Sequence, residues 1–573
     1  MTVRCDLLLR GGTIVDGSGG EPYLGDVAVL GGCILSVGSF DGEAVEVIDA
    51  TGLTVTPGFV DIHTHYDGQA IWSEELSPSS AHGVTTVVTG NCGVGFAPCR
   101  AQDQDMLIRV MEGVEDIPGV VMAEGLPWTW ETFPEYLAAL EARPRDIDVG
   151  AYLPHSPLRV YVMGHRGAQR EPATADDLDR MRTLTREAVH AGALGVATSR
   201  MMYHRTKAGE QIPSFEAADA ELQALGDGLA DAGSGIVQIV LNAPAQSWDA
   251  ELDHLIEVVD NSGRPATFTL GTANSGPPVW EQAMARVAAA NAHGAHIRAQ
   301  VLPRPVGLIM GFALSTNPFS ACPGWAGIEA LPLAERMARL RDPDVRTALV
   351  GEQPDPRDLF ALSARNWAWI FPLGDPPNYE PAREDSIAAR AAAAGVAPEQ
   401  IAYDLLLERD GTALLYNALG NFHENRLDAV YELMKNPDTV VGLGDGGAHY
   451  GAICDASYPT FMLTYWTRDR AGPRLSVAEA VRMLARDPAE LVGLHDRGRL
   501  AAGCKADLNV IDLERLALHA PVVRYDLPGG GRRLDQAATG FVATIVSGEV
   551  IRRHDAATGA RPGLVVRGAQ PAP

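Results

Sequence analysis

The chain has 573 residues, and 46 Lys and Arg stand against 73 Asp and Glu, so its formal net charge at pH 7 is −27. So acidic a chain repels nucleic-acid phosphates and anionic lipid surfaces, which argues against both as partners. Apolar residues make up 46%, typical of a globular protein, and no run reaches the roughly 18 apolar residues of a membrane span. The first residues lack the apolar core of a signal peptide, and the seven cysteines are scattered, which predicts reduced thiols in the cytoplasm.

The two ends of the chain share one pattern, in which short apolar runs are separated by glycine turns. This pattern is typical of a small layer of β-strands. It covers residues 1–56 and returns over 496–553. We therefore predict one β-sandwich built from both ends, followed by a C-terminal tail over 554–573.

The middle of the chain alternates apolar strand patterns with helical patterns. Such strands are buried on both faces, and eight of them alternating with helices predict an α/β fold, a (β/α)₈ TIM-type barrel over 57–304 and 438–495. The interval 305–437 is too long for a loop and predicts an inserted, mainly helical segment between barrel strands seven and eight. An open doubly wound sheet is the alternative. The predicted strands are 58–63, 85–89, 148–153, 194–198, 236–241, 266–270, 297–301 and 439–444.

Barrel enzymes carry their chemistry where the strands end, and the first predicted strand ends in Asp61-Ile-His63-Thr-His65. In an extended segment, residues two apart point to the same side. The imidazoles of His63 and His65 can therefore converge on one metal ion. A chance pair is the alternative in a chain with 15 histidines, but here the pair directly follows an apolar strand.

Four segments together resemble the amidohydrolase superfamily, and within it the D-aminoacylase (N-acyl-D-amino-acid deacylase) family. They span both ends and most of the barrel, and leave 305–437 poorly covered. The resemblance implies a β-sandwich beside a metal-binding barrel that hydrolyses C–N bonds of N-acyl-amino acids. The segments are TPGFVDIHTHYDGQ, GVTTVVTGNCGVGFAPC, LGDGGAH and DPAELVGLHDRGRLAAGCKADLNVID.

The resemblance implies two further site residues. Cys92, in the GNCG segment after the second strand, corresponds to a zinc ligand of the deacylases. Asp445, in GDGGAH after the eighth strand, corresponds to the aspartate that binds metal and shuttles the proton. Each has a plainer alternative, because a small thiol packs well in a core and Asp-Gly is a common turn.

The sequence departs from the family where metal-binding histidines are expected, after strands five and six. Strand five runs into Asn242 and strand six into Thr272, without a histidine in either. A bridging lysine carbamate is also improbable, since Lys207 is the sole candidate near the barrel face. We therefore expect one divalent ion, most simply Zn²⁺, held by His63, His65, Cys92 and Asp445, with a second ion or none as alternatives.

Other polar residues follow strands three and four. His155, Arg200 and His204 are candidate substrate contacts, because an arginine or histidine on this face can hold a substrate carboxylate. Each can instead pair with an acidic neighbour in so acidic a chain.

These observations predict a metal-dependent hydrolase of a linear amide, in particular an N-acyl-amino acid and most simply an N-acyl-D-amino acid. Asp445 is its catalytic residue, and a small-molecule amide is its partner. We also expect a homo-oligomer. Two alternatives remain open: a cyclic amide or imide hydrolase, and a non-catalytic binding protein on the same scaffold.

Overall fold

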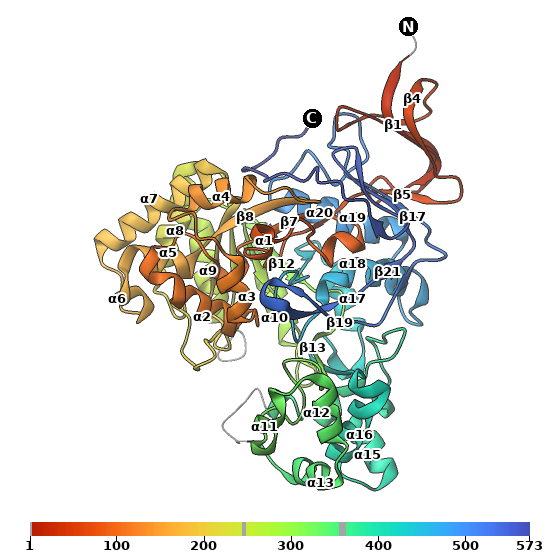
Figure 1. The fold of residues 1–573 in the computed structure, drawn as a ribbon. Helices are drawn as coiled ribbons and strands as arrows, with labels where there is room; N and C mark the ends of the chain where they lie inside the picture. Colours follow the sequence, from red (N-terminus) through yellow and green to blue (C-terminus); the bar gives the residue numbers. More distant parts are fainter. Residues whose placement is uncertain (1–2, 243–247, 355–361) are drawn as a thin grey trace.

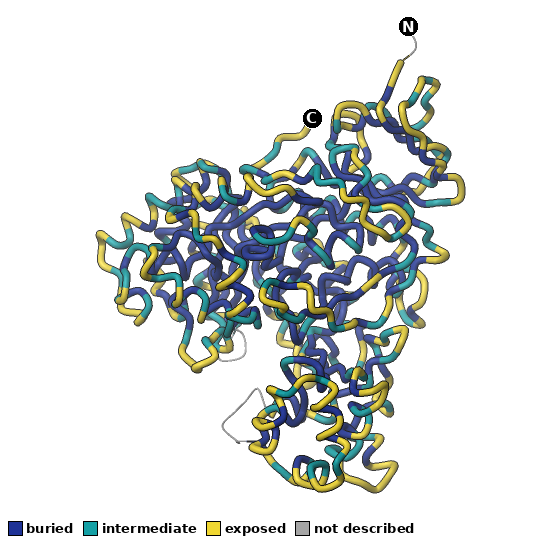
Figure 2. The backbone as a smooth tube through the Cα atoms, viewed as in Figure 1, coloured by how far each residue is buried: buried dark blue, intermediate teal, exposed yellow. Residues whose placement is uncertain are grey.

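The computed structural model describes residues 3–242, 248–354 and 362–573. Its centre is a parallel eight-stranded sheet with helices packed outside it, and Figure 1 shows a layer of strands on one side and a separate lobe below. Buried backbone runs continuously through the centre, while the outer turns of the lobe are exposed (Figure 2). Within the described ranges, no helix combines the length and the hydropathy needed to cross a bilayer.

The eight predicted barrel strands are confirmed, and they pair in chain order. Their side chains are almost all buried, as expected of strands covered on both faces. The barrel closes where the first and last strands end: Asp445 N donates to His63 O at 3.0 Å, and His65 N donates to Gly446 O at 2.7 Å. The strands are β6 (Phe59–Asp61), β7 (Val84–Thr89), β8 (Asp148–Pro154), β9 (Gly195–Ser199), β10 (Ile236–Val240), β11 (Ala266–Thr269), β12 (Ile297–Val301) and β16 (Thr439–Val441).

Helices between the strands cover the outside of the barrel. α7 (Ala175–Ala191) begins at a capping box in which the Thr174 hydroxyl accepts from Asp177 N, and it ends at Gly192; α19 (Val477–Leu484) begins in the same way at Ser476. The covering helices are α4 (Phe133–Glu141), α7 (Ala175–Ala191), α8 (Asp219–Ala232), α9 (Trp248–Ser262), α10 (Val279–Ala292), α17 (Asp428–Lys435), α19 (Val477–Leu484) and α20 (Arg486–Leu491).

The two ends of the chain form one continuous nine-stranded sheet. β5 (Thr54–Pro57) pairs antiparallel with β17 (Leu508–Ile511), and this pairing joins the N-terminal and C-terminal strands. The predicted tail begins in this sheet, and its residues 562–570 lie against the barrel, where Val566 N donates to Val149 O at 2.8 Å. The other strands are β1 (Arg4–Ile14), β2 (Tyr23–Leu30), β3 (Cys33–Gly38), β4 (Glu43–Asp49), β22 (Phe541–Val546), β23 (Glu549–Arg553) and β24 (Ala556–Ala557).

The lobe leaves the barrel after β12 and has a hydrophobic core of its own, in which Phe312 stacks on Trp325. Where the chain leaves β12 and enters the lobe, Arg304 forms a buried ion pair with Asp455, which anchors this end of the lobe to the segment after the last barrel strand. Its elements are β13 (Val306–Met310), β14 (Ile370–Pro372), β15 (Leu415–Gly420), α11 (Ala326–Glu329), α12 (Leu333–Leu340), α13 (Pro343–Gly351), α15 (Ile387–Ala394) and α16 (Pro398–Gly411).

Candidate metal centre

His63 and His65 lie just beyond β6, and both are buried at the C-terminal end of the barrel. His63 Nδ1 donates to Gln300 Oε1 on β12 at 2.7 Å. This hydrogen bond fixes the ring and leaves Nε2 as the free nitrogen, as is usual for a metal-binding histidine. The two rings lie edge to face, with centroids 5.6 Å apart.

Cys92 follows β7 and brings its thiol to the two imidazoles. Its Sγ lies 3.4 Å from His63 Nε2 and 3.9 Å from His65 Nε2. The residue has a φ of 56°, a left-handed conformation that is uncommon outside glycine, and its backbone N donates to Gln238 Oε1 at 3.1 Å. This strained backbone conformation directs the Cys92 thiol toward the imidazoles of His63 and His65.

Asp445 follows β16 and faces the same point from across the barrel closure. Its Oδ1 lies 3.6 Å from both His63 Nε2 and His65 Nε2, and 21% of the side chain is exposed. The glycines around it permit this approach: a Cβ on Gly447, where φ is +87°, would lie 2.8 Å from the His65 backbone. Asp445 thus lies beside both ligand nitrogens and remains partly exposed.

The spacing of these atoms fits a divalent ion. Ligands bound tetrahedrally at about 2.0–2.3 Å lie about 3.3–3.8 Å from one another, and the separations of 3.4, 3.6 and 3.6 Å fall in that range, with 3.9 Å just outside it. The ligand atoms of His63, His65 and Cys92 all lie within 4.8 Å of one another. Two nitrogens, a sulfur and a carboxylate oxygen form a donor set typical of zinc.

Electrostatics in the cluster also favour a cation. Burial raises the pKa of the Cys92 thiol to about 12 and lowers that of His63 to about 4. Burial opposes ionisation of Asp445, but the close approach of His65 and the neighbouring imidazoles of His63 and His449 outweigh it and lower the pKa of Asp445. A thiol in this position needs a bound positive charge to become the thiolate that ligates metal.

Glu115 and His449 also belong to this cluster. Glu115, at the C-terminal end of α2 (Gln104–Val114), is 1% exposed, and its Oε2 lies 3.4 Å from His65 Nε2 and 3.3 Å from His449 Nε2. His449 lies in the GDGGAH segment quoted above. Glu115 gave no signal in the sequence, because an acidic residue at a helix end usually faces solvent.

Comparison with known proteins identifies the family. The model of the amidohydrolase family matches residues 46–552. The chain belongs to this family. An N-acyl-D-aspartate deacylase from Alcaligenes xylosoxydans xylosoxydans is 39% identical over 198 residues, which are 34% of this chain and 36% of that protein. An N-acyl-D-glutamate deacylase from the same organism is 24% identical over 574 residues, which are 99% of this chain and 97% of that protein.

Solved structures agree with the fold of this amidohydrolase. A D-aminoacylase structure superposes with a TM-score of 0.64 at 22% identity, covering 98% of this chain and 100% of that one. An N-acyl-D-glutamate deacylase from Bordetella bronchiseptica, complexed with zinc and a phosphonate inhibitor, gives a TM-score of 0.65 at 21% identity, covering 99% of this chain and 100% of that one. At such identities the likeness shows the barrel fold.

The amidohydrolase has no histidine beyond β10 or β11 that faces the cluster, among the residues that the structure describes. Asn242 accepts from Met202 N, and Thr272 N donates to Asn421. His254 lies on α9 and pairs with Asp219, and Lys207 pairs with Glu112 at 3.0 Å. The donors expected at these two strand ends are thus replaced by ordinary structural contacts.

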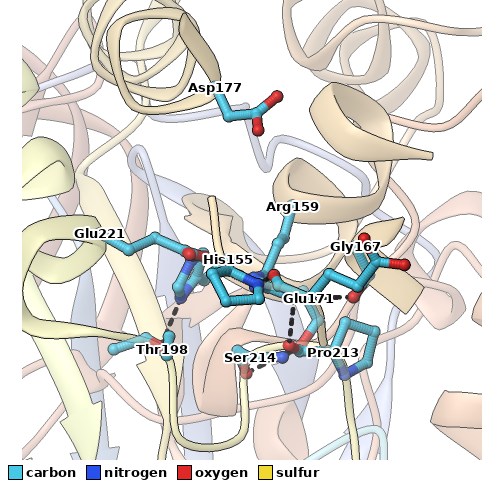
Figure 3. A network of polar contacts seen from close by, with 12 residues as sticks. His155, Arg159, Gly167, Glu171, Asp177, Thr198, Pro213, Ser214 and Glu221 are labelled. Atoms are coloured by element: carbon cyan, nitrogen blue, oxygen red, sulfur yellow. Dashed lines mark hydrogen bonds and ion pairs between the residues drawn. The ribbon is translucent and has the colours of Figure 1, made fainter. Parts of the chain in front are cut away.

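His155 does not reach the cluster with a free nitrogen. Its Nε2 donates to Glu221 Oε1 at 2.9 Å, and its Nδ1 is hydrogen-bonded to the Thr198 hydroxyl at 2.8 Å (Figure 3). Arg159 Nε donates to the same Glu221 oxygen at 2.6 Å. All of these groups are buried, so the prediction that His155 contacts substrate is not supported by its position.

The other two predicted substrate contacts differ from each other. Arg200 pairs with the buried Glu251 at 3.0 Å and donates to Ala217 O, so its guanidinium is occupied within the protein. His204 Nδ1 is hydrogen-bonded to Ser199 at 2.8 Å. Burial, then the nearby imidazoles of His449 and His65, lower the pKa of His204 to about 3. His204 is therefore a neutral imidazole close to the cluster, whereas Arg200 is a structural cation.

Proposed function

We propose that this amidohydrolase hydrolyses the amide bond of an N-acyl-amino acid, with the D configuration preferred. The observation that carries the proposal is the convergence of His63 Nε2, His65 Nε2 and Cys92 Sγ beside the carboxylate of Asp445. Its membership of the amidohydrolase family and its similarity to deacylases of N-acyl-D-amino acids support the reaction class.

The ion that fits these four residues is Zn²⁺. A bound ion of this kind would supply Lewis acidity for the scissile carbonyl and would lower the pKa of a water molecule from about 16 toward about 7. His63, His65 and Cys92 would hold it, as a set of nitrogen and sulfur donors that oxygen-preferring cations such as Mg²⁺ do not match.

Asp445 moves the proton. Its carboxylate is partly exposed and lies beside both imidazoles, so it can accept a proton from the attacking water. The same group then delivers that proton to the departing nitrogen, because an amide anion is too poor a leaving group to depart unprotonated. His63, through its bond to Gln300, keeps the facing nitrogen fixed throughout.

A substrate carboxylate needs a local attraction in a chain with a net charge of −27. Since Arg200 is paired with Glu251, we assign the contact with the substrate carboxylate to His204, whose ring lies near His449 and His65. A neutral imidazole donates one hydrogen bond without competing with the acidic cluster for protons.

The direct test combines metal analysis with a substrate panel. Zinc-loaded protein is assayed against N-acetyl-D-amino acids, their L enantiomers, and a cyclic imide such as a hydantoin. We expect about one tightly held Zn²⁺ and turnover of at least one N-acyl-D-amino acid that chelation abolishes. Turnover confined to the cyclic substrate assigns the alternative reaction, and turnover of none by metal-loaded protein contradicts an enzymatic role on this class.

Two further predictions concern the protein as a whole. The seven cysteines, all within the described residues, form no disulfide, which is consistent with the reducing cytoplasm that we propose as its compartment. Assembly into a homo-oligomer stays a prediction, which light scattering of the purified protein tests.

A further inference from the structure

A surface cavity lies at the opposite end of the barrel from the metal centre. It measures about 650 Å³ and is lined by residues that precede β11, by residues before and at the start of β12, by residues that precede β16, and by the segment around the end of α20. These segments mark the amino ends of the barrel strands, whereas His63, Cys92 and Asp445 follow the carboxyl ends. Cavities of roughly 300–1,000 Å³ are of the size that binds small molecules.

Arg298 is the arginine that lines this cavity. On β12 it stands two residues before Gln300, whose side chain reaches His63 inside the barrel. Residues two apart on a strand point to the same side, so Arg298 faces the barrel axis one layer closer to the amino-terminal mouth. Its side chain is half-buried there.

The charge of Arg298 has no partner in the protein. Its guanidinium makes no hydrogen bond, ion pair or ring contact with any of the residues that the structure describes. More deeply buried arginines use their donors: Arg304 and Arg497 pair with carboxylates, and Arg336 donates to backbone carbonyls. Withdrawing a charged group from water without a partner costs free energy. The donors of Arg298 are therefore available to a ligand.

Two acidic side chains also line the cavity, but each has another partner. Asp438 Oδ1 accepts from Asn291 Nδ2 at 2.8 Å, and Glu490 pairs with Arg499 at 2.5 Å. Neither carboxylate forms an ion pair with Arg298, although all of these residues are described. Their negative charge disfavours a doubly charged ligand such as phosphate, because like charges across a binding surface repel each other.

The remaining walls of the cavity supply imidazoles and apolar surface. His296 and His495 are exposed at the cavity, and an imidazole can donate a hydrogen bond. Pro265, Pro437 and Leu491 provide apolar contacts. A guanidinium recognises a carboxylate through two parallel hydrogen bonds. This combination fits a molecule that carries one carboxylate on an apolar body.

We propose that this cavity binds a small monocarboxylate with an apolar body. Arg298 contacts the carboxylate in a bidentate way, and His296 and His495 supply hydrogen bonds at the rim. The site is separate from the metal centre and goes beyond the proposed function. Residues on the amino-terminal face of such barrels ordinarily serve stability, but a guanidinium without a partner does not stabilise the fold. Ligand binding accounts for its position.

The experiment measures hydrogen–deuterium exchange of the zinc-loaded protein by mass spectrometry, with sodium hexanoate as the probe. We expect saturable protection of peptides that cover 291–298 and 437–439, and none from inorganic phosphate at equal ionic strength. The hexanoate concentration that gives half-maximal protection measures the affinity.

Three variants define the role of the guanidinium. Arg298→Gln should weaken hexanoate binding by at least about tenfold, because it removes the charged donors. Arg298→Lys should lie between this variant and the native protein, since lysine keeps the charge but cannot form the bidentate contact. Arg186→Gln is the matched control, because Arg186 on α7 is also half-buried and forms no ion pair with a described residue; it should bind as the native protein does.

Several results would overturn the proposal. These are the absence of saturable protection, equal protection in Arg298→Gln and the native protein, and protection confined to peptides that contain His63, Cys92 or Asp445. Phosphate that protects as well as hexanoate contradicts the ligand class. Without ligand, Arg298→Gln should unfold at the same temperature as the native protein, because no contact is lost; a clear loss of stability assigns Arg298 a structural role instead. Zinc content and turnover test the proposed function separately.

Discussion

Two buried clusters on the same face of the barrel each combine histidine with glutamate. In the first, which follows β8 and β9, His155 and Arg159 both donate to Glu221, at 2.9 and 2.6 Å, and the other ring nitrogen of His155 is hydrogen-bonded to Thr198 (Figure 3). In the second, at the barrel closure, Glu115 Oε2 lies 3.4 Å from His65 Nε2 and 3.3 Å from His449 Nε2, and neither oxygen of Glu115 accepts a hydrogen bond from a described residue.

The difference shows what each cluster does. In the first cluster, the hydrogen bonds offset the free-energy cost of burying the polar groups, so the cluster stabilises the fold. In the second cluster, the burial of metal-ligand atoms that make no hydrogen bonds costs free energy unless an ion binds to them. This cluster therefore indicates a binding site. Burial and residue type alone do not distinguish the two clusters, whereas interatomic distance does. Substitutions at the metal centre and in the hydrogen-bonded cluster test this distinction.

The largest effect is expected when both imidazoles of the HxH pair are removed. In the His63→Ala, His65→Ala double variant, Cys92 and Asp445 alone cannot hold a divalent ion tightly. The tightly bound metal should disappear, and hydrolysis should fall below detection. Metal analysis after dialysis and circular dichroism check this, with the fold retained because β6 itself is unchanged. Stoichiometric metal in the folded double variant would contradict the assignment of His63 and His65 as metal ligands.

Asp445→Asn should keep metal and lose turnover. An amide cannot accept the water proton, and general acid–base help is worth about 10²–10⁴ in rate. We expect kcat to fall by about that factor while KM changes little, because the His63, His65 and Cys92 donors remain. Steady-state kinetics on zinc-loaded protein measure this split. Near-native kcat would remove the proton-transfer role from Asp445.

The sequence predicted the barrel well, because its signals are local. Strands such as β8 and β10 are short apolar runs that are buried on both faces, and the structure has all eight where they were expected. His63 and His65 were found for a similar reason, since two side chains two apart in an extended segment share a direction. Cys92 and Asp445 came from a family resemblance, and the structure brings both to the imidazoles.

Contacts between distant segments were beyond the reach of the sequence. Glu115 meets His449 across more than 300 residues, and nothing near either residue signals the other. Arg200 was a plausible substrate contact until Glu251, from a helix after the next strand, was seen to neutralise it. His155 is paired in the same way, because its ring nitrogens bond to Glu221 and Thr198. Pairing partners decide whether a polar residue is free, and a single sequence does not show them.

A moderate effect is expected from the residue that orients His63. Gln300→Leu removes the oxygen that accepts from His63 Nδ1, while leaving every proposed ligand in place. Loss of such a supporting hydrogen bond typically costs 10–100-fold in metal affinity. Competition with a chromophoric chelator measures the change. Gln223→Leu, on α8 away from the cluster, is the control and should bind metal as the native protein does; equal affinities for both variants would contradict the orienting role.

The smallest effect at the metal centre, and a clear one on stability, is expected from Glu221→Gln in the closed cluster. The substitution keeps the shape of the side chain but removes the negative charge that Arg159 and His155 share, leaving a guanidinium buried with carbonyl partners alone. Breaking a buried pair in this way costs about 3–5 kcal/mol. The apparent midpoint of thermal unfolding should therefore fall by several degrees, while metal affinity and kcat of the folded protein stay near native values.

Glu115→Gln is the informative counterpart, because it removes an equally buried charge and is expected to lower metal content without lowering stability. If both variants lose stability alike and neither loses metal, then ligand spacing and hydrogen-bond closure do not separate a binding site from a structural network in this barrel.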